Sequence, residues 1–151
     1  MLAALAPGAS AEQLDELEPV VGQPLTPILR DLLAWHNGTL DGAVNVRIDG
    51  PWSLMSVEEI IGTVEMMRDL LHGEPGWIEQ TWWSEDWVPF LDDGGGDNIC
   101  VDLTGDGHTL QRNRKPYQGV PGQLIMFDHE AEWRTVEAPS LQTWLSRCSA
   151  D

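Results

Sequence analysis

The chain is organised around residues 87–103, WVPFLDDGGGDNICVDL. The first part, Trp87–Leu91, has the length and apolar composition of a strand. Pro89 has no N–H to donate, which places it at a sheet edge or at a strand start. The acidic segment Asp92–Asp97 then carries three consecutive glycines, which allow backbone angles that other residues avoid. Because Asn98–Leu103 alternates polar and apolar residues as a half-buried strand does, the stretch predicts a hairpin with a long acidic tip.

Two strands and a closing helix are expected after the hairpin. Gln123–Phe127 is a short apolar run after a Pro-Gly pair and predicts a buried strand. Glu132–Val136 alternates and predicts a last strand, with Trp133 on one face. Ser140 is a good N-cap for a final helix. The residues of that helix expected to face the core are Leu141, Trp144 and Leu145.

Two helices are expected near the N-terminus. Ser10 begins the first, and Gln13 three residues later completes a capping box. Pro19 predicts that this helix ends or kinks near Glu18, with Gly22 as a plausible stop, because proline cannot donate to the helical ladder.

The second helix is expected to begin at Thr26 as N-cap, with Pro27 at its first position. A left-handed stop is expected at Asn37-Gly38. The apolar stripe of this helix includes Trp35 and is expected in the core, and His36 is expected to cap carbonyl groups.

The central helix carries the strongest signal. Ser56 and Glu59 have the spacing of a full capping box, and apolar residues keep helical spacing up to Gly73. Ahead of it, Ala43–Ile48 alternates as a strand does, and Trp52–Met55 is expected to add a short strand.

These elements, helices first and then strands broken by one helix, define an α+β fold. The length suits a single domain over residues 1–151. The segment Glu74–Asp86 has no clean period and is expected to be a loop. Its rings at Trp77, Trp82 and Trp83 either fill the edge of the core or are exposed as interface anchors.

The charge is strongly negative, with 25 acidic against 8 basic residues and a formal net charge of -17. No Lys or Arg occurs from Asp69 to Gln111. Such a surface repels phosphate backbones and anionic membranes, so we expect neither nucleic acid nor membrane as a partner. It attracts a basic protein, although the charge is also consistent with solubility alone. The basic cluster Arg112–Lys115 is expected to be a solvated loop or a local counter-charge.

The two cysteines, Cys100 and Cys148, have neither metal-ligand spacing nor a CxxC pair. We expect two buried, reduced thiols, and a disulfide only if the fold brings them together. Because residues 1–11 lack a basic n-region and a long apolar run, a cytoplasmic location is expected.

No catalytic motif stands out. His129, between Asp128 and Glu130, could join Asp97 and Asp102 in a metal or acid–base site, but the spacing is unspecific. The plain alternative is a solvated acidic turn with His129 bonded to backbone at a strand end. We therefore expect no catalytic residue, no metal and no cofactor.

The chain resembles the SUKH superfamily, in particular its Smi/Knr branch. The matching pieces are an opening PGAS helix, WHNG (Trp35–Gly38), WVPF, GGGD with ICVDL, GQLIMFDHE and the closing SLQTWL helix. The resemblance implies one curved, mostly antiparallel sheet flanked by N-terminal helices, a central helix and a C-terminal helix. It also implies structural roles for a set of motif residues: Trp35, Gly38, Trp87, Pro89, Gly94, Gly95, Gly96 and Asp102.

The same resemblance implies a non-catalytic protein-binding module, because bacterial members of this family are immunity proteins that neutralise toxins. We expect a basic toxin domain as the partner. The alternatives are a regulatory or scaffold protein of the cell-wall-assembly type and, less favoured, a metal-dependent enzyme; the oligomeric state stays open. The residues expected to contact the partner are Trp82, Trp83, Glu85, Asp86, Asp92, Asp93 and Asp97.

Overall fold

The computed structural model describes residues 4–40, 48–73, 82–105 and 119–150. Within them the helices are α1 (Ala11–Val21), α2 (Pro27–Trp35), α3 (Val57–Gly73) and α5 (Leu141–Ala150). The strands are β1 (Ser53–Leu54), β2 (Trp87–Asp92), β3 (Asn98–Asp102), β4 (Leu124–Phe127) and β5 (Thr135–Ala138). The predicted α+β class is confirmed. No helix in the described ranges combines the length and apolar character needed to cross a bilayer.

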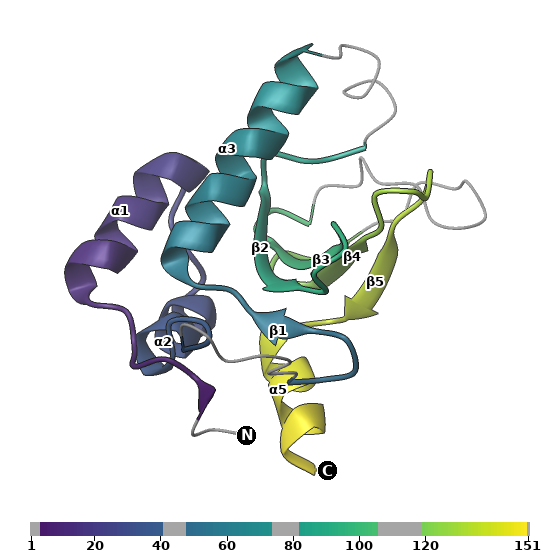
Figure 1. Cartoon of the computed structure of the whole chain (residues 1–151). Helices are drawn as coiled ribbons and strands as arrows, with labels where there is room; N and C mark the ends of the chain where they lie inside the picture. The colour runs from purple at the N-terminus through teal and green to yellow at the C-terminus, as the bar shows by residue number, and fades with distance from the viewer. Residues whose placement is uncertain (1–3, 41–47, 74–81, 106–118, 151) are drawn as a thin grey trace.

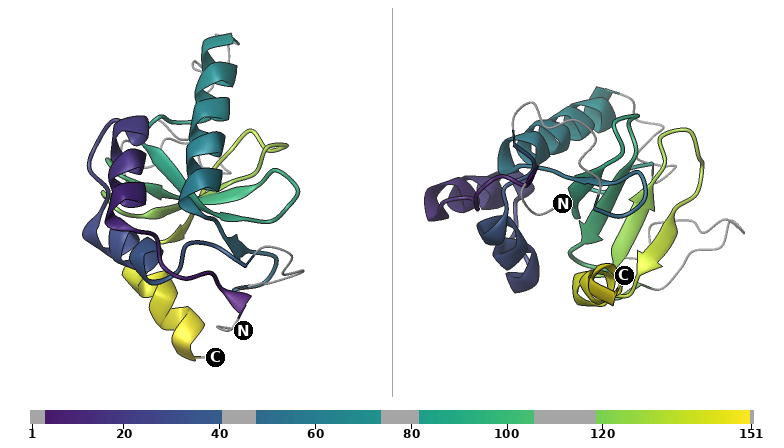
Figure 2. Two further views of the ribbon diagram at one scale, coloured as in Figure 1. Left: turned by 60° about the vertical axis from the view of Figure 1, so that its left-hand side comes forward. Right: turned by 60° about the horizontal axis from the view of Figure 1, so that its bottom comes forward.

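The strands form one open sheet in the order β1-β2-β3-β4-β5, and every pairing is antiparallel. In Figure 1, α1, α2 and α3 lie to the left of the strands, and α5 lies below them. Figure 2 shows α1, α2 and α3 together on one side of the sheet, with α5 beside β5. The expected arrangement of helices around a single sheet is confirmed.

The predicted hairpin is the pair β2–β3, in which Trp87 faces Asp102 and Asp92 faces Asn98. Pro89 occupies an edge-like position inside the sheet, because β1 is two residues long and pairs only with Leu91 and Asp92. The pairing register between β2 and β3 shifts after Pro89, which bends the strand locally.

The prediction that β3 is half-buried was wrong, because all five residues of β3 are buried. One face of the strand, with Ile99 and Val101, joins the main core between the sheet and the helices. Cys100 on the other face joins a second cluster that contains Trp83 and Phe127. A central strand covered on both faces loses the exposed side that alternation normally indicates.

Helix α1 continues through Pro19 to Val21 rather than ending near Glu18. The capping box of Ser10 and Gln13 is formed as predicted. The helix ends at Gly22, where φ is 86° and the N–H donates to the Glu18 carbonyl. One missing N–H in the last turn is tolerated because the buried face of the helix continues to Val21.

Helix α2 begins as predicted, with Thr26 at the N-cap and Pro27 at the first position, but its end differs from expectation. Thr26 makes no side-chain cap, and its hydroxyl is buried without a hydrogen-bond partner among the described residues. The helix ends at His36 in an extended conformation, and the ring Nδ1 of His36 lies 2.7 Å from the Ala6 carbonyl. Asn37 instead accepts a 2.7 Å bond from the Val57 N–H and so caps α3. Trp35 was expected in the core but is 57% exposed.

Helix α3 confirms its capping box, in which Glu59 accepts from the Ser56 N–H and the Ser56 hydroxyl accepts from the Glu59 N–H. Met67 is buried on its inner face and Met66 is exposed on its outer face. The helix therefore packs by the side that the sequence period predicted.

The C-terminal elements are largely as expected. The last strand begins at Thr135 rather than Glu132, because residues 132 and 133 form a bend in which the buried Arg134 donates to the Ala131 and Trp133 carbonyls. Ser140 caps α5 by accepting from the Thr143 N–H. In α5, Leu141 and Trp144 are buried, whereas Leu145 is half-buried.

Cys100 lies in β3 and Cys148 lies in α5, and both are free thiols. Cys100 is buried as expected, and Cys148 is half-buried rather than buried. Several predictions fall on residues outside the described ranges and stay predictions. They are most of the strand Ala43–Ile48, the part of the loop that contains Trp77, and the Arg112–Lys115 cluster.

Candidate protein-binding site at the acidic tip

The turn between β2 and β3 is shaped by its own aspartates. The Asp92 carboxylate accepts from the Gly94 N–H, and Asp93 Oδ1 accepts from the N–H groups of Gly95 at 2.7 Å and Asp97 at 3.1 Å. Gly96 has φ of 107°, and a Cβ there would lie 3.3 Å from the His129 Nδ1. The glycines and two of the aspartates therefore hold the tip in one conformation.

A second acidic turn lies beside the first. Because Asn98 pairs with Phe127, the residues that follow β4 lie next to the residue that precedes β3. The Asp97 Oδ1 is 2.7 Å from the His129 Nδ1 and 3.0 Å from the His129 backbone nitrogen. Asp128 in turn accepts from the Glu130 N–H at 2.9 Å. The histidine thus joins the two turns.

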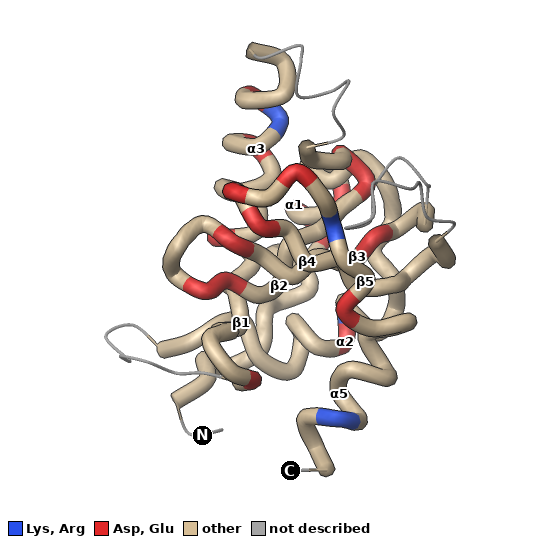
Figure 3. Tube along the Cα trace, turned by 90° about the vertical axis from the view of Figure 1, so that its right-hand side faces the viewer, with Lys and Arg blue, Asp and Glu red and all other residues tan. Residues whose placement is uncertain are grey.

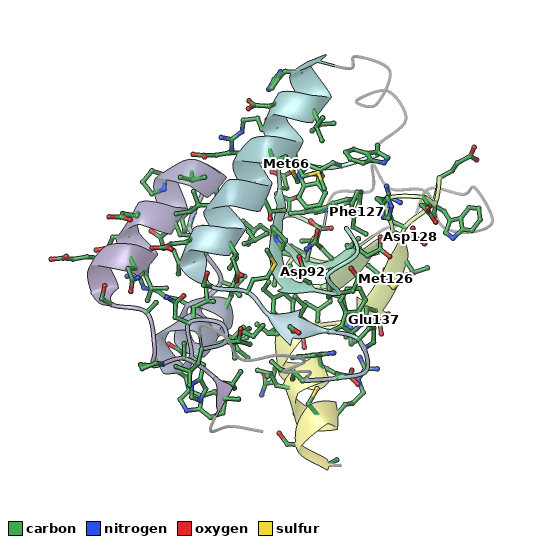
Figure 4. The ribbon with its side chains drawn as sticks, in the orientation of Figure 1. Met66, Asp92, Met126, Phe127, Asp128 and Glu137 are labelled. Carbon is green, nitrogen blue, oxygen red and sulfur yellow. The ribbon has the colours of Figure 1, made fainter. Side chains whose placement is uncertain are left out.

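We define the acidic tip as Asp92, Asp93, Asp97, Asp128 and Glu130. Figure 3 shows acidic positions of the β2–β3 turn and of the turn after β4 on the same face of the molecule. Figure 4 places Asp92 at the end of β2 and Asp128 just beyond Phe127 of β4. The Glu130 side chain is 84% exposed, and Asp97 is half-buried at 24%.

Arg134 lies behind the second turn and supports it. Its guanidinium donates to the carbonyls of Asp128, Ala131 and Trp133 at 2.8 to 3.2 Å, and to the Trp82 carbonyl through two nitrogens. Its carbon Cζ lies 4.6 Å from the centre of the Phe127 ring. Burial lowers the pKa of Arg134 to about 10, so this buried cation stays charged at neutral pH.

Three residues at the tip have side chains of the kinds that bind metal ions. Single atoms of Asp97, Asp128 and His129 all lie within 4.8 Å of one another, and two carboxylates with an imidazole can hold a divalent cation. In this structure Asp97 Oδ1 and His129 Nδ1 already bond to each other. Asp102, considered with them from sequence, lies at the opposite end of β3 and does not belong to this group.

Comparison with family models gives one result across nearly the whole chain. The model described as the SMI1 / KNR4 family (SUKH-1) matches residues 8–147. The chain belongs to the SMI1/KNR4 (SUKH-1) family. The resemblance inferred from sequence is therefore confirmed. Comparison with curated proteins finds no match.

In this SUKH-1 domain, the residues predicted to contact a partner do not form one face. Glu85 and Asp86 precede β2, whereas Asp92 and Asp93 follow its far end, a separation of roughly 20 Å for a strand of this length. Glu85 lies 3.4 Å from Arg68 and from His72 of α3. The structure brings together Asp92, Asp93 and Asp97, and separates them from the other acidic pair.

Asp86 has a bracing role at the other end of β2. Its Oδ1 accepts from the Gln23 amide at 2.8 Å, and its Oδ2 accepts from the Thr104 hydroxyl at 3.2 Å. Because both bonds join it to its own chain, we attribute to Asp86 a structural role and leave it out of the acidic tip.

The prediction that Trp82 and Trp83 anchor a partner requires exposed rings, and the structure buries one of the two. Trp83 is 5% exposed and packs edge-to-face on Trp87 and Phe127, with ring centres 5.5 and 5.1 Å apart. Trp82 is half-buried and packs edge-to-face on the same Phe127 ring at 4.9 Å. Trp83 therefore fills the second cluster and is not available as an exposed anchor.

The motif residues of the SUKH-1 domain have structural roles, and Trp35 is the exception. Asp102 is buried and accepts from the Gly105 N–H and from the Gln123 amide, both at 2.9 Å. Gly38 has φ of 79°, and a Cβ there would lie 2.8 Å from the Ser56 nitrogen at the start of α3. Of the two motif tryptophans, Trp87 is buried and Trp35 is 57% exposed.

Sequence reasoning left Asp128 and Glu130 out of the predicted binding set. The signal was present in the DHE triplet directly after the apolar run Gln123–Phe127. Pairing that strand with β3 places the triplet beside Asp97, but the pairing itself is not visible in the sequence.

The contact with Asp97 gives His129 a testable protonation behaviour. The hydrogen bond to Asp97 raises the pKa of His129 above its ordinary value of 6.5, with Glu130 and Asp128 adding to the effect. The contact therefore stabilises the fold fully below pH 6.5, and this contribution is lost as the pH rises through the folded-state pKa.

We expect an NMR titration of the His129 ring to give a pKa above 6.5 in the wild type and a lower value in Asp97→Asn. The asparagine keeps an acceptor oxygen but removes the charge. An unchanged His129 pKa in that variant would mean that the pair seen here does not form in solution.

Proposed function

We propose that this SUKH-1 domain is a non-catalytic immunity protein that binds a basic toxin domain through the acidic tip. Members of the family are generally non-catalytic and are often immunity proteins. The proposed place of action is the cytoplasm of the producing cell. The single observation that carries the proposal is the gathering of five carboxylates on two adjoining turns at one end of the sheet.

The tip keeps acceptor capacity for a partner. Asp92 and Asp97 hold their turns through Oδ1, and each carboxylate has a second oxygen that makes no hydrogen bond to the described residues. These oxygens can accept bonds from arginine or lysine donors. Because the turns are held by internal bonds, binding costs little loop ordering.

The cations in the described part of the chain leave this surface negative. Arg30 pairs with Asp15 and Glu18 on α1, and Arg68 pairs with Glu85. Arg147 donates to the Glu137 carbonyl, and Arg134 is buried behind the tip. A basic partner would therefore be attracted to the tip from beyond contact distance, with screening over about 8 Å at physiological salt.

The test uses the toxin domain encoded beside this gene as the binding partner. The variant Asp92→Asn, Asp97→Asn, Glu130→Gln removes three charges and retains amide oxygens for the turn hydrogen bonds. At low salt we expect its affinity to fall by about 10- to 100-fold, mainly through a slower association rate. Raising the salt concentration should narrow the difference between variant and wild type.

The matched control removes the same three charges from the helices: Asp31→Asn, Asp69→Asn and Glu16→Gln, all at exposed positions. It should bind within about twofold of wild type if the tip itself is the contact surface. Wild-type affinity in the tip variant at low salt would exclude the tip. A neighbouring gene with no toxin domain would instead favour the regulatory or scaffold role.

A further inference from the structure

A cavity lies between α2, α5 and the N-terminal segment, away from every residue of the acidic tip. Its volume is about 170 Å³. The side chains that form it come from distant parts of the chain: Leu5, Leu32, Trp35, Leu54, Leu145 and Cys148. In Figure 1, α2 and α5 lie in the lower part of the molecule, where the N-terminal segment also runs.

Among the described residues, the lining of the cavity contains no Asp, Glu, Lys or Arg. Its polar groups are mostly used within the chain, because His36 Nδ1 contacts the Ala6 carbonyl and the Ser149 hydroxyl donates to the Leu145 carbonyl. The Trp144 side chain also lines it, and its Nε1 is a buried donor with no hydrogen-bond partner among the described residues. A charged ligand would lose its hydration here without compensation.

The volume of the cavity limits the size of the ligand that it can bind. An apolar cavity of about 150 Å³ stays dry and takes up a benzene-sized molecule. The cavity of this chain is slightly larger, and most of its lining is apolar. At its edge, Trp35 presents a 57% exposed ring that can cover a bound molecule.

We propose that this cavity is a binding site for a small neutral aromatic molecule of one or two rings. Burial of the apolar rings supplies the affinity, and the Trp144 N–H offers a hydrogen bond to a ligand that carries an acceptor. The proposal is independent of toxin binding.

The rate at which a thiol reagent labels Cys148 can report whether the cavity is occupied. Of the two cysteines, Cys100 is fully buried in the sheet and Cys148 is half-buried in the cavity wall. A thiol reagent should therefore label the native protein at Cys148. Indole at roughly ten times its dissociation constant should slow this labelling about tenfold, because only about one molecule in eleven is then unoccupied.

A second measurement keeps the test independent of thiol chemistry. In amide NMR spectra, titration with benzene or indole should give saturable shifts concentrated at residues of the cavity wall. The variant Leu145→Trp, which places a ring in the cavity, should abolish both effects. The exposed Met66→Ala on α3 is the control and should leave both unchanged.

If Leu145→Trp does not fold, the wild-type titrations decide alone. Absence of saturable protection of Cys148 together with absence of localised shifts in the wild type would overturn the proposal. The proposal would also be overturned if the cavity accepts only a side chain from a partner protein, because the wild type would then show neither effect. A failure here would leave the charge-variant test of toxin binding unaffected.

Discussion

We expect Arg134→Ala to lower the free energy of unfolding by about 3–5 kcal/mol, as measured by urea denaturation followed by circular dichroism at pH 7. The guanidinium is buried and donates to four backbone carbonyls, on Trp82 and on the turn after β4. Removing it leaves these acceptors without their donor. It also removes the cation from above the Phe127 ring.

Two further variants separate the loss of hydrogen-bond donors from the loss of packing. Arg134→Met keeps most of the apolar stem and should recover less than half of the loss, because packing is restored but the donors are not. Arg147→Ala removes an exposed arginine with one bond to the Glu137 carbonyl and should cost less than about 1 kcal/mol. Equal losses at the two arginines would contradict the structural role assigned to Arg134.

The second large effect is expected at Trp144. Its side chain is 2% exposed and packs edge-to-face on Phe90, with ring centres 5.6 Å apart. We expect Trp144→Ala to destabilise the fold by about 3–5 kcal/mol, because a large buried ring is removed from the junction of α5 with the sheet.

The matched control is Trp35→Ala, which truncates the same kind of side chain at a mostly exposed position. Its cost should stay below about 1 kcal/mol in the same denaturation experiment. Similar destabilisation by both substitutions would mean that Trp35 is packed in solution against something that the described residues do not include.

The contrast between these two tryptophans shows what sequence signals can and cannot give. Both lie on helices whose apolar stripes were predicted to face the core. The prediction was confirmed for Trp144 and wrong for Trp35, because helical spacing shows which residues share a face but not how far a neighbouring element covers it.

The candidate site likewise has features that the sequence predicts and features that depend on strand pairing. The acidic turn at Asp92–Asp97 was predicted because glycines and aspartates act on the backbone within a few residues. The separation of Glu85 from this turn follows from the length of β2, which the sequence also indicated. The meeting of Asp97 with His129 depends on the pairing of β3 with β4, which joins residues 32 apart in the chain.

The amino-acid sequence alone determined the hairpin, the capping boxes of α1 and α3, the α+β class and the family. Each of these depends on residue types at short spacing, where backbone geometry and local hydrogen bonds act. Tertiary structure alone decided that β3 is covered on both faces, that Arg134 is buried, and that two acidic turns form one tip. These features depend on contacts between distant segments, and such contacts form only when the whole chain packs around its core.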